Sequence, residues 1–160
     1  MPEFGKYNAE WPRVDEFILG FDSSRVFRGA VHLMEARMIE ASCHCGAVRV
    51  KLPSIPDEVK ECNCSICRRT GAVLAYYSFK EVRVVPESGA TDIYMWGDRE
   101  IEFHRCKICG NFTHWSPVDK SYDRMGVNAR LLPPELLTDI RVLEFDGANT
   151  WTVIGERRGV

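Results

Sequence analysis

The stretch Cys62-Asn63-Cys64-Ser65-Ile66-Cys67 places three cysteines within six residues. Four more cysteines stand in two short pairs on either side of it, Cys43-x-Cys45 before and Cys106-x-x-Cys109 after. Segments of this kind let one turn or strand present two sulfurs to a single metal ion, and zinc in proteins is typically held by four ligands in a tetrahedron. The spacing therefore predicts zinc sites around which the chain folds.

The seven cysteines are enough for two zinc sites of different kinds. Seven ligands make one set of four and one set of three. A closed set of four thiolates is typical of structural zinc, whereas three protein ligands leave a coordination position for water or substrate, as in catalytic sites. We therefore expect two zinc ions, one structural and one at an open site.

Other uses of cysteine fit this pattern less well. Cysteines that serve as small apolar core residues would be scattered, but each cysteine here lies within three positions of another. Disulfides are disfavoured by the odd number, and the N-terminal residues do not have the pattern of a signal peptide. An iron-sulfur cluster on Cys-x-Cys-x-x-Cys is an open alternative, which would make the purified protein brown.

Length, composition and charge limit the remaining function classes. A chain of 160 residues with 45% hydrophobic and 28% charged residues is typical of one globular domain. The formal net charge of -2 gives no electrostatic reason to expect a nucleic-acid partner. The longest uninterrupted apolar run, 72–77, is too short to span a bilayer, so we expect no membrane association. Reduced cysteines favour a cytoplasmic location, and no oligomeric state is favoured.

Alternating apolar and polar residues predict a mainly β domain of antiparallel sheets. Turn-forming residues at 86–89, 97–98 and 146–149 separate these segments. After residue 38 a helical turn is expected only at 134–137, where proline suits the first position. The predicted strands are 47–52, 74–79, 82–85, 92–96, 100–103, 141–145 and 150–154.

The residues before this pattern form a separate segment. Residues 1–37 are expected to be an N-terminal extension, with a helix at about 24–36 whose apolar face holds Val26, Ala30, Leu33 and Met34. The strands and cysteines begin directly afterwards. We therefore expect the zinc-binding domain to comprise residues 38–155.

Several motifs together resemble a known family. They are 42–48 (SCHCGAV), 62–72 (CNCSICRRTGA), 106–110 (CKICG), 125–130 (MGVNAR) and the pair Asp146-Gly147. In this order they are similar to the glutathione-dependent formaldehyde-activating enzyme (GFA) family, which also includes centromere protein V. The resemblance runs from about residue 38 to about residue 151. It implies a zinc-containing β-tent of folded antiparallel sheets.

The resemblance also implies which cysteines hold which ion. Cys43, Cys45, Cys106 and Cys109 would enclose the structural zinc, which leaves Cys62, Cys64 and Cys67 at the open, catalytic site. The implied activity is that of a carbon-sulfur lyase acting on S-hydroxymethylglutathione, the adduct of glutathione and formaldehyde. A small thiol such as glutathione is thus the expected partner.

The chemistry of the open site agrees with a thiol substrate. Three thiolates give a zinc centre a formal charge of about -1, which makes it a weaker Lewis acid toward water than a three-histidine site. A thiol that coordinates such a metal loses its proton and becomes a nucleophile. The alternative function is a non-catalytic, zinc-stabilised module that binds glutathione or a protein.

Side chains near the cysteines supply further candidates. Arg68, Arg69 and Arg130 are expected to bind the carboxylates of glutathione, because a guanidinium group matches a carboxylate in geometry. His114, and less so His104, is a candidate for the fourth position of the open site or for proton transfer.

Overall fold

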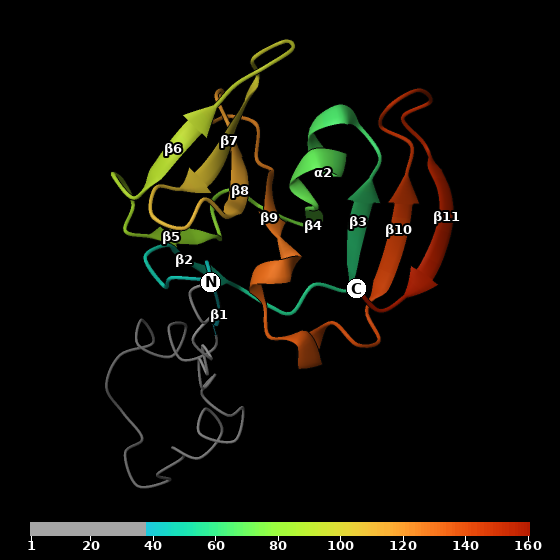
Figure 1. The fold of residues 1–160 in the computed structure, drawn as a ribbon, viewed down its shortest axis with the longest axis horizontal. Helices are drawn as coiled ribbons and strands as arrows, with labels where there is room; N and C mark the ends of the chain where they lie inside the picture. Colours follow the sequence, from blue (N-terminus) through green and yellow to red (C-terminus); the bar gives the residue numbers. More distant parts are fainter. Residues whose placement is uncertain (1–37) are drawn as a thin grey trace, which may run out of the picture.

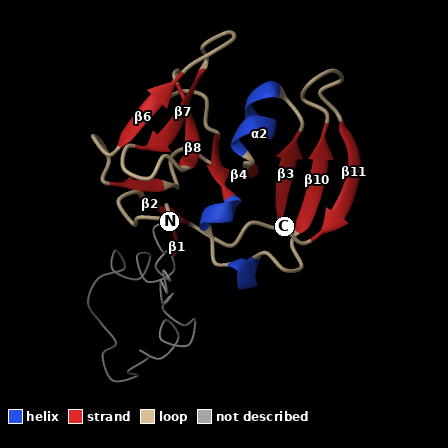
Figure 2. Cartoon of the chain, viewed as in Figure 1, coloured by secondary structure: helices blue, strands red, loops and turns tan. Residues whose placement is uncertain are grey.

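The computed structural model describes residues 38–160, which form two β-sheets with little helix (Figures 1 and 2). The expected mainly β fold is therefore confirmed in this range. The extension 1–37 and the helix expected at 24–36 lie outside the described residues. In the part described, no helix has the length and apolar character needed to span a membrane.

The smaller sheet contains three antiparallel strands in the order β1-β2-β5. These are β1 (Ile39–Ser42), β2 (Arg49–Leu52) and β5 (Arg83–Val85). Along β2 the side chains of Val50 and Leu52 are fully buried while Arg49 is exposed, as the period of two requires. The turn between β1 and β2 carries the first cysteine pair.

The larger sheet contains eight strands in the order β11-β10-β3-β4-β9-β8-β7-β6. All its pairings are antiparallel except that between β3 and β10. The chain reaches β10 from β9 through two short 3-10 helices, η2 (Ala129–Leu131) and η3 (Pro134–Leu136), the second of which confirms the predicted turn. The strands are β3 (Glu58–Cys62), β4 (Val73–Tyr77), β6 (Thr91–Tyr94), β7 (Ile101–Cys106), β8 (Phe112–Pro117), β9 (Met125–Asn128), β10 (Arg141–Phe145) and β11 (Val153–Arg158).

The two faces of the larger sheet bury different residues. On β4, Val73 and Ala75 join the main aliphatic core, together with side chains of the smaller sheet. Leu74, between them, points to the opposite face and joins a second cluster that contains Phe103 and Trp115. Cys67 belongs to this second cluster, so one cysteine set lies on the aromatic face of the sheet.

One helix within the described residues was not expected. α2 (Ser65–Thr70) follows the end of β3 directly, and Figure 1 shows it beside β3 in the middle of the molecule. The expectation of helix only near residues 134–137 is therefore wrong. Six residues are too few to show a helical period of apolar side chains. The helix ends at Gly71, whose φ of 65° is in the left-handed region that glycine adopts readily.

Candidate metal centres and pocket

The structure brings Cys43, Cys45, Cys106 and Cys109 together from two distant parts of the chain. Their sulfur atoms all lie within 4.8 Å of one another. Cys45 Sγ is 3.6 Å from both Cys43 Sγ and Cys106 Sγ, too far for a disulfide. Sulfurs placed about 2.3 Å from a central zinc ion in a tetrahedron are about 3.8 Å apart. The four cysteines therefore fit a single tetrahedral metal ion.

Backbone donors prepare this set to carry negative charge. The amide of Val48 donates to Cys43 Sγ at 3.3 Å, and the amide of Ile108 donates to Cys106 Sγ at 3.4 Å. Such hydrogen bonds favour the thiolate form. Burial has the opposite effect and raises the pKa of Cys43 to about 12, whereas at Cys109 burial is outweighed by hydrogen bonds from the backbone of Asn111 and Cys45, which lower the pKa to about 6. A bound cation would favour the thiolate form of all four cysteines.

Cys62, Cys64 and Cys67 form a second set at the junction of β3 and α2. Their sulfur atoms also lie within 4.8 Å of one another, and the amide of Cys64 donates to Cys62 Sγ at 3.4 Å. Cys62 ends β3, Cys64 is the N-cap of α2, and Cys67 is buried within the helix. Among the described residues no histidine or carboxylate joins these three sulfurs. This set is therefore incomplete for a four-coordinate metal.

The two candidate histidines lie against each other instead. His104 and His114, on neighbouring strands β7 and β8, stack with ring centroids 4.2 Å apart. His104 contacts Ser116 Oγ at 3.1 Å through Nε2, and His114 Nδ1 is 3.0 Å from Thr113 Oγ1. Neither imidazole belongs to the three-cysteine set, so neither fills its fourth position.

A loop after β10 fixes the residue between the first two cysteines of the incomplete set. Asn63 Nδ2 donates to Asp146 Oδ1 at 2.7 Å, and its Oδ1 accepts from the amide of Ala148 at 2.9 Å. Asp146 is buried and also accepts from the amide and hydroxyl of Thr150. The loop therefore holds the Cys62–Cys64 segment through the side chain of Asn63.

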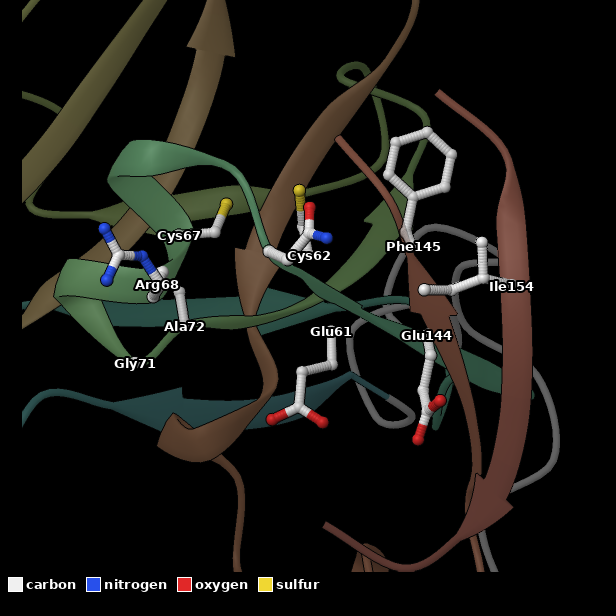
Figure 3. Close-up of a pocket in the computed structure, with 10 residues that line it drawn as sticks. Glu61, Cys62, Cys67, Arg68, Gly71, Ala72, Glu144, Phe145 and Ile154 are labelled. Atoms are coloured by element: carbon white, nitrogen blue, oxygen red, sulfur yellow. The ribbon is translucent and has the colours of Figure 1, made fainter. Parts of the chain in front are cut away.

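A pocket of about 390 Å³ opens beside this set. Figure 3 shows the sulfurs of Cys62 and Cys67 turned toward one end of it and the carboxylates of Glu61 and Glu144 toward the other. Arg157 pairs with both carboxylates, so its single positive charge offsets one of the two negative charges. The lining residues are Glu61, Cys62, Asn63, Cys67, Arg68, Gly71, Ala72, Glu144, Phe145 and Ile154.

The three arginines expected near the site differ in position. Arg68 lines the pocket. Arg69 Nη1 donates to the carbonyl of Ser65 at 2.8 Å, and Arg130 Nε donates to the carbonyl of Gly71 at 2.9 Å. These last two guanidinium groups therefore bind the backbone of α2 and its C-cap.

Two cations that were not expected from the sequence lie on the face of the sheet that carries Cys62 and Tyr76. Lys60 lies on β3 two residues before Cys62, and Arg124 lies directly before β9. Both contact the ring of Tyr76. A strand predicted over Glu58–Cys62 would have placed Lys60 on the face of Cys62 by the period of two, whereas nothing local identifies Arg124.

Comparisons with known proteins cover the part of the chain that holds the cysteines. A family model described as "Glutathione-dependent formaldehyde-activating enzyme" matches residues 38–135, which include all seven cysteines. The crystal structure of a Rhodobacter sphaeroides protein is similar, with 31% sequence identity and a TM-score of 0.54, over 64% of this chain and 97% of that one. The search of curated proteins found no significant match. The pocket residues of β10 and β11 lie beyond the range that the family model matches.

Proposed function

Because the chain belongs to the glutathione-dependent formaldehyde-activating enzyme family, we propose that it is a zinc-dependent carbon-sulfur lyase acting on a glutathione-aldehyde adduct of the S-hydroxymethylglutathione type. One observation carries the proposal. Three cysteines gather without a fourth protein ligand among the described residues, and two of them line a pocket. A thiol substrate requires a free coordination position on the metal that faces the pocket.

The two cysteine sets would then have different tasks. Cys43, Cys45, Cys106 and Cys109 hold a structural zinc, for which their spacing is suited. Cys62, Cys64 and Cys67 hold a second ion at the pocket. When bound there, zinc lowers the pKa of an added thiol, because metal-bound thiols lose their proton. Cysteine ligands of this kind need a reducing compartment, so we place the protein in the cytoplasm.

The residues of the chain shape the space in which the carbon-sulfur bond forms or breaks. In the forward direction the sulfur of glutathione bonds to the carbonyl carbon of formaldehyde, and the thiol proton ends on the new hydroxyl group. The reverse direction breaks the same bond and returns that proton. Phe145, beside Cys62, and Ile154 contribute apolar surface to the lining of the pocket.

Arg68 is the arginine that we assign to substrate binding. It lines the pocket from α2, so its guanidinium is available to a carboxylate of glutathione. Arg69 and Arg130 have a different main contact, since each donates to a backbone carbonyl at one end of α2. We therefore expect Arg68→Ala to raise the dissociation constant of glutathione more than Arg69→Ala does.

Metal analysis combined with exchange spectroscopy tests the function. The protein should contain two zinc ions per chain, and it should accelerate exchange between formaldehyde and its glutathione adduct in nuclear magnetic resonance spectra. S-methylglutathione, which has no thiol to deprotonate, should bind much more weakly than glutathione. Iron in place of zinc would contradict the metal assignment. Zinc content and glutathione binding without faster exchange would identify a binding module and refute the lyase.

A further inference from the structure

Two cations meet at one aromatic ring on the face of the sheet that carries Cys62. The Nζ atom of Lys60 lies 5.4 Å from the centroid of the Tyr76 ring, and the Cζ atom of Arg124 lies 4.2 Å from it. Contact with an aromatic face attracts a cation without using its N–H donors. Both side chains are therefore held in place while their hydrogen-bonding capacity stays available.

These two cations differ from their neighbours in having no acidic partner. Arg141 pairs with Glu58 at 3.1 Å, and Arg157 pairs with Glu61 and Glu144. In the described part of the chain no carboxylate pairs with Lys60 or Arg124, although both side chains are half-buried. Two adjacent positive charges favour an anionic ligand at this place. Of the two carboxylates that line the same hollow, Glu58 is paired with Arg141 and only Asp57 opposes such a ligand.

The cations border a hollow that is linked to the cysteine pocket through one contact of Lys60. This hollow, of about 250 Å³, is lined by Lys60, Tyr76 and Arg124. Lys60 Nζ also lies 5.1 Å from the ring centroid of Phe145, which lines the cysteine pocket. Lys60 therefore lines the hollow and also contacts a lining residue of the cysteine pocket. The hollow is completed by Ser54, Ile55, Pro56, Asp57, Glu58 and Tyr77.

The distance along β3 suits a small thiol with a carboxylate. Lys60 and Cys62 are two residues apart on one face, which corresponds to about 7 Å. A molecule whose sulfur reaches the cysteines can thus extend a carboxylate to the cations.

Building on the proposed function, we propose that Lys60 and Arg124 bind a carboxylate of the thiol substrate and thereby select acidic thiols over neutral ones. A lysine offers three donors and an arginine five, enough to bind both carboxylate oxygens. Glutathione has two carboxylates, so one can reach this pair while Arg68 receives the other.

Calorimetry on the full-length, zinc-loaded protein tests this pair. Glutathione and the neutral thiol 2-mercaptoethanol are titrated into wild type, Lys60→Gln, Arg124→Gln and the charge-preserving Lys60→Arg. Lys120→Gln is the matched control, because Lys120 also lies over an aromatic ring, 5.0 Å from the centroid of Phe79, but pairs with Glu102 at 3.6 Å. Circular dichroism melting verifies that each variant is folded.

Each glutamine variant should bind glutathione about tenfold more weakly, as expected for the loss of a charge-assisted hydrogen bond, with unchanged affinity for 2-mercaptoethanol. Lys60→Arg and Lys120→Gln should bind both thiols like wild type. Unchanged glutathione affinity in both glutamine variants would overturn the assignment of the cations and leave the proposed function standing. If wild type bound neither thiol, the proposed function would fail, and the selection of acidic thiols would fail with it.

Discussion

Gly147 lies so close to Cys62 that a Cβ atom at position 147 would stand 2.5 Å from the sulfur of Cys62. It would also lie 3.3 Å from the Cβ of Cys64. Only a residue without a side chain therefore lets the loop after β10 close over the incomplete cysteine set. The loop is tied to the same segment through the bond between Asn63 and Asp146. The three-cysteine set thus depends on a loop more than eighty residues away in sequence.

We expect Gly147→Ala to expel the metal from this set and to spare the four-cysteine set. Adding a methyl group at a packed position costs about 1–3 kcal/mol, and here it would displace a sulfur. Zinc content should fall from two ions toward one, and cobalt substitution should lose part of the thiolate charge-transfer absorption. Ala148→Ser, at an exposed neighbouring position, is the control. Full metal content in Gly147→Ala would contradict the role of this contact.

The two cysteine sets should respond differently to single substitutions. Cys106 is 1% exposed and joins the turn between β1 and β2 to the end of β7. Cys106→Ser should therefore lose zinc together with most of the folded, soluble protein, because structural zinc binding is coupled to folding. Cys64→Ser should lose about one zinc ion and keep its fold. Equal unfolding of the two variants would show that the division into structural and open sites is wrong.

The sequence predicted best the features whose chemistry is local. Cysteine number and spacing predicted one set of four and one set of three, and the family resemblance assigned the seven sulfurs to these sets as the structure groups them. Regular alternation predicted 141–145 with the bounds of β10. β3 was missed because Val59 is its only large apolar residue before Cys62. β11 was predicted at 150–154 but begins at Val153, since Asp146 holds the amide of Thr150 in the preceding turn.

Contacts between segments that are distant in sequence could not be predicted from local patterns. The contact of Arg124 with Tyr76 requires the pairing of β9 with β4, which no spacing in the sequence indicates. The wall that Phe145 and Ile154 give to the pocket requires β10 beside β3, the one parallel pairing of the larger sheet. Alternation and cysteine spacing give information only about residues that are close along the chain. These contacts depend on the order of the strands in the sheet.

A side chain at a second glycine, Gly126, should also be poorly tolerated. Here the expected effect is on the free energy of unfolding and not on the metal content. A Cβ at Gly126 would lie 2.1 Å from Nε1 of Trp115, whose indole covers that glycine across the β8–β9 pair. Gly126→Ala should lower the free energy of unfolding by about 3 kcal/mol, measured in urea. Adding Trp115→Phe should restore part of the loss, because the smaller ring leaves room. Purely additive effects of the two changes would contradict this explanation.

The buried histidine stack should make the protein sensitive to acid. Burial lowers the pKa of His114 from its ordinary 6.5 to about 3, with a contribution from His104. Because the pKa in the folded state is the lower one, the unfolded state binds the proton first. The contribution of His114 to the free energy of unfolding is therefore fully present above about pH 6.5 and is lost as the pH falls toward 3.

His114→Gln should remove this part of the acid sensitivity. Between pH 6 and 4 the wild type should lose about 1.4 kcal/mol of unfolding free energy per pH unit more than the variant, since one additional proton is taken up on unfolding. Protonation of the cysteine ligands affects both proteins alike and cancels in the difference. Urea unfolding at several pH values measures it, with pH 8 as the reference at which the imidazole is neutral in both states. Parallel stability curves for the two proteins would show that His114 does not stay neutral in the fold.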